Sequence, residues 1–73
     1  MNHIRRILNE KDVSFHKFVK LSGVSIHFIM DVERRGHTPR EWILESFSKE
    51  LARIDGNTPE YHLEKITMKY TKK

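Results

Sequence analysis

The sequence predicts an all-α, single-domain protein of four to five short helices. Apolar residues recur at three- and four-residue spacing along most of the chain, which is typical of amphipathic helices. Serine, threonine, proline and glycine stand between these apolar stretches at places that suit helix starts and ends. With 73 residues and no cysteine, the chain has room for one modest core and has no disulfide to support it.

Two helices are expected before the first sharp corner of the chain. The first covers residues 2–11, where the apolar stripe consists of Ile4, Ile7 and Leu8. The second follows Ser14, a suitable N-cap, and its shared face is formed by Phe15, Phe18, Val19 and Ser22. Gly23 then supplies the positive φ that a tight corner between two helices commonly requires.

The next two helices have equally clear start and stop signals. Ser25 can cap a third helix that ends at Gly36, with Ile29 and Val32 facing inward and Val24 at the corner. The fourth helix is expected to have Thr38 as N-cap, Pro39 at its first position and Glu41 completing a capping box. It should run to about Ile54, with an inward stripe of Ile43, Leu44, Phe47, Leu51 and Ile54.

A fifth helix is expected after the stop formed by residues 55–57. Thr58 and Pro59 restart a helical pattern whose inward residues are Leu63, Ile66 and Tyr70. We therefore divide the chain into residues 1–54 and residues 55–73, the latter an additional C-terminal helix and basic tail packed on the same domain.

The segment of residues 14–39 has the layout of a helix-turn-helix, two short helices joined by a corner at Gly23. Over residues 3–54 the chain resembles the lambda-repressor/Cro-type (Xre-like) helix-turn-helix family. The matching features are Ser14 before helix two, Ser22-Gly23-Val24-Ser25 at the corner, Ile29 with Val32 in helix three, Glu33-Arg34 at its exit, and Pro39 before helix four.

The resemblance implies a small DNA-binding transcriptional regulator of bacterial or phage type. Helix three would then lie in the major groove of duplex DNA. The residues offered to the base edges would be Ser25, Ile26, His27, Met30 and Asp31. Phosphate contacts would come from Lys17, Arg34, Arg35 and Arg40, together with the amide-rich starts of helices two and four.

The chain departs from the family pattern at several positions. Val19 stands where the family prefers alanine, and Gly36 comes one residue late, with Arg35 in the customary glycine position. Phe15 and Ile26 occupy positions where family members often carry glutamine for reading bases. These differences do not alter the predicted fold. Those at Phe15 and Ile26 remove side chains with which family members recognise specific bases.

The apolar side chains around helix three support an alternative function. Phe15, Ile26, Phe28 and Met30 could form an exposed patch, and such patches usually mark protein contacts. In that interpretation the scaffold is a phage- or plasmid-type modulator that binds a host regulator or replication protein. The competing interpretation is that Phe15 and Phe28 pack into the core, which leaves only Ile26 and Met30 exposed.

Trp42 falls off the apolar stripe of the fourth helix and has two interpretations. It could pack beneath the fifth helix with Leu63 and Ile66. It could instead join Tyr61 and Tyr70 in a homodimer contact, because aromatic residues are enriched in such interfaces.

Composition and motif content disfavour other functions. The formal charge of +4 favours an anionic partner. No apolar run approaches the roughly 18 residues that span a membrane, and no signal peptide is recognisable, so we expect a cytoplasmic protein. We expect no enzyme, no cofactor and no metal site: no nucleophile or phosphate-loop motif occurs, Glu41 and Glu45 resemble a solvated face, and the histidines lack ligand spacing (His3, His16, His27, His37 and His62).

Overall fold

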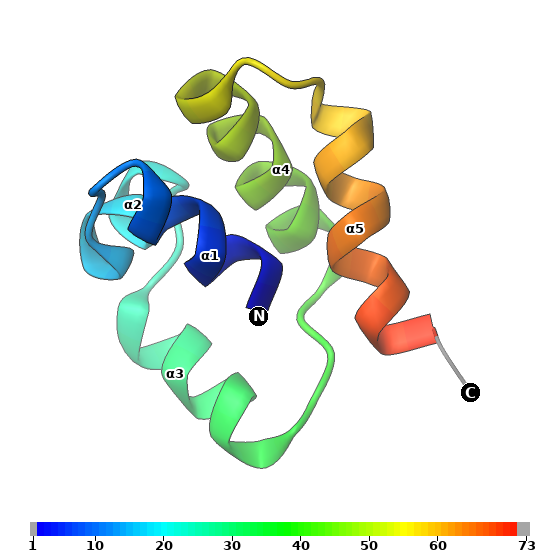
Figure 1. Ribbon diagram of the computed structural model, residues 1–73. Coiled ribbons are helices and arrows are strands. Elements are labelled where there is room, and N and C mark those ends of the chain that lie inside the picture. Colours follow the sequence, from blue (N-terminus) through cyan, green and yellow to red (C-terminus); the bar gives the residue numbers. More distant parts are fainter. Residues whose placement is uncertain (1, 72–73) are drawn as a thin grey trace.

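The computed structural model describes the backbone of residues 2–71 and the side chains of residues 3–67. Within this part of the chain there are five helices and no strand, so the predicted all-α class is confirmed. The helices are α1 (Asn2–Glu10), α2 (Phe15–Leu21), α3 (Ile26–Arg35), α4 (Glu41–Asp55) and α5 (Pro59–Thr71) (Figure 1).

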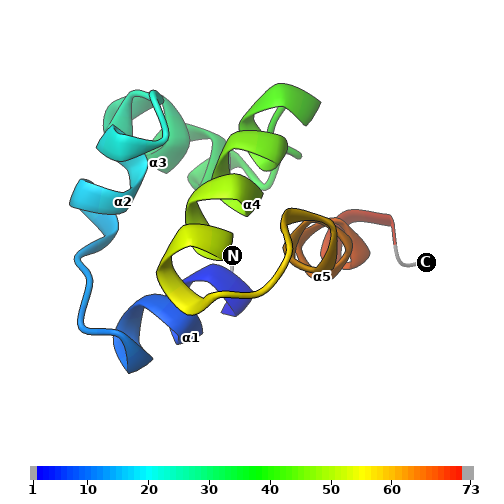
Figure 2. The same cartoon turned by 90° about the horizontal axis from the view of Figure 1, so that it is seen from above.

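Helix α4 is the central element around which the others are arranged. Seen from above, α2 and α3 lie on one side of α4 and α5 lies on the other (Figure 2). Helix α1 packs against both α4 and α5, and α2 packs against both α3 and α4. The extents of 29 × 26 × 20 Å leave space for one core only.

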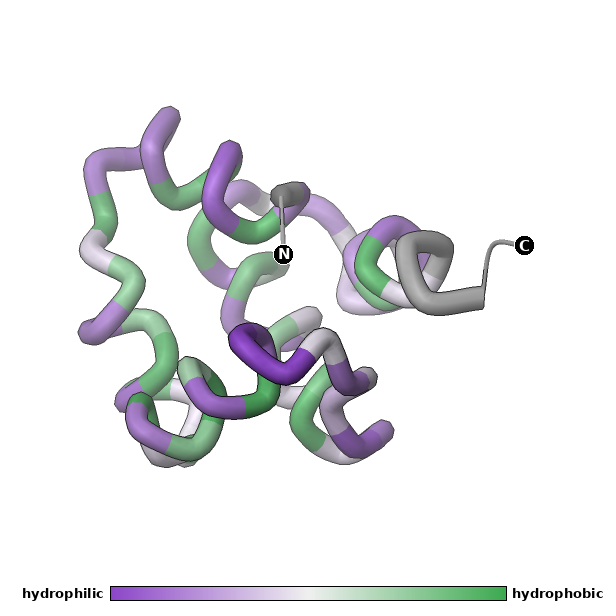
Figure 3. Tube along the Cα trace, turned by 90° about the horizontal axis from the view of Figure 1, so that it is seen from below, coloured by the Kyte–Doolittle hydropathy of each residue, from purple (hydrophilic) through white to green (hydrophobic). Residues whose placement is uncertain are grey.

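The core is formed where the apolar stripes of the helices meet. Apolar residues recur along each helix between hydrophilic ones (Figure 3). The rings of Phe18 and Phe47 are fully buried, and their centroids lie 5.1 Å apart. Full burial of such a side chain contributes roughly 1.5–3 kcal/mol. The remaining buried apolar residues are Ile4, Ile7, Leu8, Val19, Val24, Ile29, Ile43, Leu44, Leu51 and Ile66.

The predicted N-caps Ser14 and Ser25 are present, and Thr58 caps α5 in the same way. The side-chain oxygens of Ser14, Ser25 and Thr58 accept hydrogen bonds from backbone N–H groups three residues later, at 3.0, 3.4 and 3.1 Å. Each bond satisfies an N–H that has no partner inside its helix, which stabilises a helix start by about 1 kcal/mol.

The corner between α2 and α3 is a left-handed turn at Gly23. Its φ is +79°, its N–H donates to the carbonyl of Lys20, and the N–H of Val24 donates to the carbonyl of Val19. This pair of bonds is the Schellman arrangement, which closes the end of a helix and redirects the chain. Helix α1 ends in the same way at Asp12, with φ +58°, a turn that no glycine marks in the sequence.

Several predicted positions differ in the structure. Helix α4 starts at Glu41, so Thr38 is not its N-cap and Pro39 is not its first residue. The N-cap is Arg40, whose carbonyl accepts the first helical hydrogen bonds and whose side chain makes no cap bond. Pro39 is buried, so packing fixes its position ahead of the helix. Val32, expected to face inward, is only partly buried.

We expect Gly23→Ala to lower the free energy of unfolding by about 1 kcal/mol. A Cβ at this position would meet no atom within 4 Å, so the cost comes from the left-handed backbone. The lower entropy of the unfolded alanine chain offsets part of that cost. Chemical denaturation measures the effect, with exposed Lys20→Ala as a control that should change stability by less than about 0.5 kcal/mol. A Gly23→Ala protein as stable as the parent would contradict the role of the corner.

Candidate nucleic-acid interface

Helix α3 presents a charged face to solvent. Ile29 is its one fully buried residue among those described. Successive residues of a helix are rotated by about 100° around its axis. The side chains that point away from Ile29 are therefore those at positions 27, 31, 34 and 35. These outward residues are His27, Asp31, Arg34 and Arg35.

The predicted base-reading residues are distributed around α3 rather than gathered on one side. Ser25, His27 and Met30 are exposed, whereas Ile26 is half-buried against the core. Asp31 forms an ion pair with Arg35, at 3.2 Å between Oδ2 and Nε. His27 and Asp31 therefore occupy the outward face, and Ile26 and Met30 lie along one flank.

The predicted phosphate-binding residues are all exposed. Lys17 lies in the first turn of α2, next to the N-cap Ser14 that accepts its backbone N–H. Arg34 and Arg35 form the last turn of α3, and Arg40 stands just before α4. Arg34 and Arg35 thus belong to the outward face of α3 itself, Lys17 and Arg40 lie at the starts of α2 and α4, and Asp31 places one acidic group on that face.

Phe15, which we predicted in an alternative protein-binding face, is largely covered. The guanidinium of Arg5 lies 4.1 Å from the centroid of its ring, a cation–π geometry. Arg5 also donates to Oε1 of Glu33 at 3.1 Å. One α1 side chain therefore contacts both α2 and α3, and it removes much of the Phe15 ring from solvent.

Phe28 and Met30, two further residues of the predicted protein-binding face, lie apart from each other on the surface. Phe28 and Met30 are 45% and 41% exposed. Two residues along a helix correspond to a rotation of about 200°, so the two side chains leave α3 on opposite flanks. The structure does not bring Phe15, Ile26, Phe28 and Met30 into one surface.

A hollow lies at the corner between α2, α3 and the start of α4. Its walls carry the exposed rings of Phe28 and Trp42, and Arg40 is its one charged lining residue; the others are Gly23, Val24, Ser25 and Ile43. Trp42 is 52% exposed, so the prediction that it packs beneath the fifth helix is wrong. Residue 42 belongs to the first turn of α4, beside the helix-turn-helix corner.

Trp42 and Tyr61 do not form one aromatic surface on a single molecule. Trp42 is the second residue of α4, whereas Tyr61 precedes His62, which contacts Asp55 at the other end of α4. Thirteen residues of helix separate Trp42 from Asp55, a rise of about 20 Å. Tyr70 lies outside the described side chains.

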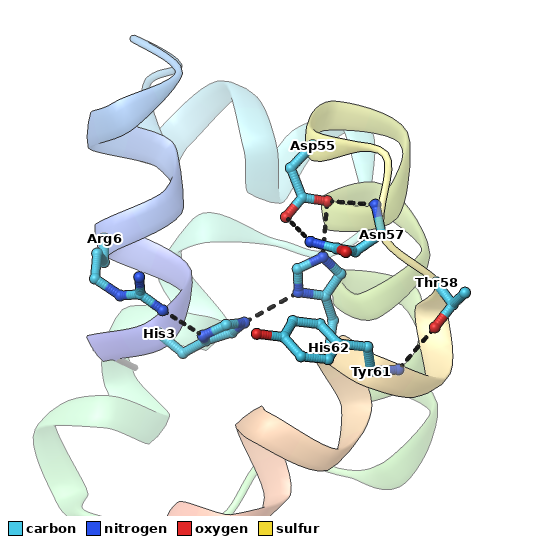
Figure 4. A network of polar contacts seen from close by, with 7 residues as sticks. All are labelled: His3, Arg6, Asp55, Asn57, Thr58, Tyr61 and His62. Atoms are coloured by element: carbon cyan, nitrogen blue, oxygen red, sulfur yellow. Dashed lines mark hydrogen bonds and ion pairs between the residues drawn. The ribbon is translucent and has the colours of Figure 1, made fainter.

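A buried polar network joins three helices on the side away from α3 (Figure 4). The ring of His62 is fully buried, with Nε2 2.9 Å from Oδ1 of Asp55 and Nδ1 3.0 Å from Nε2 of His3. Arg6 lies 3.2 Å from Nδ1 of His3. Sequence analysis missed this network, because a separation of 59 positions along the chain hides the proximity of His3 and His62.

The network lowers the pKa values of two of its groups, His3 and Asp55. Burial lowers the pKa of His3 from 6.5, and the neighbouring His62 and Arg6 lower it further. Burial acts to raise the pKa of Asp55, but hydrogen bonds from the backbone N–H of Asn57, from His62 and from the Asn57 side chain outweigh it and lower that pKa to about 2. Both shifts favour a neutral His3 beside an ionised Asp55.

The chain matches no protein-family model, no curated protein and no solved structure. Among the described residues, no group of three or more histidines and carboxylates is arranged to hold a metal ion. No helix in the same part of the chain has the length and apolar character needed to cross a membrane. The geometry around α3 must therefore support any functional proposal by itself.

We expect the single tryptophan to report an open environment. Since Trp42 is about half exposed, acrylamide should quench its fluorescence readily in the folded protein, and unfolding should raise the quenching only modestly. Steady-state quenching with and without denaturant measures this. A blue-shifted emission that resists acrylamide until the protein unfolds would place the ring beneath α5 after all.

Proposed function

We propose that the chain is a member of the lambda-repressor/Cro-type family and a small cytoplasmic DNA-binding regulator of bacterial or phage type. The observation that carries this proposal is the charged outward face of α3, held on a rigid corner, with further basic side chains at the starts of α2 and α4. A helix of this kind fits the major groove, whose width admits one helix.

The phosphate contacts follow from the positions of the cations. Lys17, Arg34, Arg35 and Arg40 stand at the ends of α2, α3 and α4, where they would contact the phosphates on both sides of a groove-bound α3. Each such contact releases counterions, so log affinity should fall with log salt at a slope of about 0.9 per phosphate.

The outward face of α3 supports weak base discrimination. Of the predicted base-reading residues, His27 is an exposed one that can donate a hydrogen bond to a guanine edge. Asp31 repels phosphates unless it accepts from a cytosine amine, and its ion pair with Arg35 offsets part of that repulsion. We propose binding in which phosphate contacts supply most of the affinity.

The hollow beside α3 favours a second candidate function, a protein-binding modulator that engages a host regulator or replication protein. Phe28 and Trp42 expose apolar surface on a concave site, where the aromatic anchor of a partner is commonly bound. This candidate uses the flank of α3 that faces α4, whereas DNA binding uses its outward face. Separate substitutions can therefore test the two functions.

For DNA binding, we expect the Arg34→Ala/Arg35→Ala protein to bind every duplex more weakly, with a salt slope smaller by about two. Anisotropy of a labelled duplex at about 50 and 200 mM salt measures both quantities. Lys49→Ala/Lys65→Ala is the matched control, because it removes the same charge from exposed positions on α4 and α5. Absence of duplex binding by the parent protein at low salt would refute the proposal.

Removing a negative charge from the outward face of α3 tests the same proposal in the opposite direction. Asp31→Asn removes the acidic group from the centre of the charged face, so it should tighten duplex binding at low salt. Weaker binding by this variant for all sequences would show that α3 does not approach DNA through this face.

For the protein-binding candidate, we expect Phe28→Ala/Trp42→Ala to abolish capture of a partner while leaving duplex binding unchanged. Both side chains are exposed, so their loss should cost little stability. Leu21→Ala is the control, since Leu21 is also 52% exposed but does not line the hollow. Affinity capture with the three proteins makes the comparison, and equal capture by all of them would exclude the hollow as the site.

A further inference from the structure

The polar network around the buried ring of His62 is a continuous chain of three hydrogen bonds that reaches the surface at Arg6. It runs from Arg6 to His3 on α1, then to His62 on α5, and ends on Asp55 at the end of α4, with distances of 3.2, 3.0 and 2.9 Å. Figure 4 shows the two imidazole rings between the arginine and the carboxylate. The chain thus connects all three helices that meet at the start of α5.

The chemistry of the two ends fixes the direction of every bond. A guanidinium only donates, so Nδ1 of His3 accepts from Arg6. Neutral His3 then carries its proton on Nε2 and donates to Nδ1 of His62. Neutral His62 carries its proton on Nε2 and donates to the carboxylate of Asp55. With both rings neutral, every ring nitrogen has a partner of the correct kind.

An added proton breaks this pattern. A proton on Nδ1 of His62 faces the Nε2–H of His3, and a proton on Nδ1 of His3 faces the Arg6 guanidinium. One added proton costs the Arg6 bond in either arrangement, because His3 either takes the proton on Nδ1 or moves its own hydrogen there to accept from His62. A second proton would produce two cationic rings with centroids 5.2 Å apart.

The charges around the rings do not compensate for two cations. Arg6 on α1 and Lys65 on α5 are positive, and Asp55 on α4 is the one carboxylate bonded to either ring. Glu10 lies 3.8 Å from Arg6 and stays on the exposed side of α1. The ring of Tyr61 packs edge-on against both imidazoles and contributes no charge.

We propose that the Arg6–His3–His62–Asp55 chain is a proton-sensitive latch, which fastens the start of α5 to α1 near neutral pH and releases it from α1 on acidification. His62 lies in the first turn of α5, whereas the buried apolar anchor Ile66 lies one turn later. Protonation breaks the chain on its α1 side, whereas the bond from His62 to the ionised Asp55 and the packing of Ile66 remain. Release is a local opening of α5 rather than unfolding of the core.

The pH range follows from the group that titrates. Because the pKa of His3 is lowered from 6.5, its contribution to stability is complete above pH 6.5 and is lost as the pH falls through the lowered value. The carboxylate of Asp55 stays ionised over that range, since its pKa is about 2. The imidazoles, and not the carboxylate, operate the latch.

Hydrogen exchange at about pH 7.5 and about pH 5, corrected for intrinsic rates, tests the latch. We expect protection in the first half of α5 to fall on the order of tenfold, since the lowered pKa of His3 makes the folded attachment less stable in acid. Protection in α2 and α3 should not fall with it. Uniform loss across all helices, or no loss in α5, would overturn the proposal.

Variants separate the latch from general acid sensitivity. In His3→Gln the amide oxygen can accept from Arg6 and the amide nitrogen can donate to His62, but position 3 no longer takes up a proton, so α5 should keep its protection at the lower pH. His16→Gln, a change at an exposed histidine on α2, should open α5 as the parent does. A His3→Gln protein with the parent's pH dependence would refute the mechanism.

Titration of the parent protein by proton NMR gives a readout that needs no variant. The ring signals of His3 should change over the pH range in which α5 loses its protection, because the same proton breaks the chain. A change of the His3 signals outside that range would overturn the proposal even if His3→Gln failed to fold.

Discussion

The contact between Phe18 and Phe47 packs the helix-turn-helix, α2 and α3, against α4. Phe18 comes from the first half of the helix-turn-helix and Phe47 from the middle of α4, and neither ring reaches solvent. The tilted rings lie 5.1 Å apart, within the range in which aromatic pairs attract beyond simple burial. Because α2 is fixed on α4 by this contact, the short turn at Gly23 starts α3 in a defined direction.

The orientation of α3 depends further on α1. Helix α3 contributes a single fully buried side chain, Ile29, so core packing alone holds it weakly. Arg5 adds a second attachment, since it covers the ring of Phe15 and binds the carboxylate of Glu33 at once. The contact explains why an apolar residue at position 15 is not available to a ligand. It also leaves the opposite side of α3 as the face on which our functional proposal rests.

Function and regulation are proposed for separate regions of the molecule. The charged face of α3 and the hollow at its flank lie on one side of α4, and the buried histidine network lies where α1, α4 and α5 meet. Helix α1 contacts both regions, because His3 belongs to the network and Arg5 to the attachment of α3. The two side chains are two residues apart on one helix, which gives the network a direct structural connection to the helix-turn-helix.

Local signals in the sequence determined the helices and most of their ends. Ser14, Ser25 and Thr58 act through bonds to residues three positions away, and Gly23 acts through its own φ, so their roles are readable without a fold. The start of α4 differs from the prediction, since Arg40 and not Thr38 is its N-cap although its side chain makes no cap bond, so no local side-chain signal marks this start.

Only the tertiary structure decided which side chains are neighbours. The positions of Trp42, Phe28 and Phe15 depend on how α1 and α4 cross the helix-turn-helix, and no periodic pattern encodes such crossings. The pairing of His3 with His62 is the extreme case, since the two residues come from opposite ends of the chain. The sequence by itself determined an all-α domain with a helix-turn-helix corner. Packing determined which of its faces are open, because long-range contacts carry no local signature in the chain.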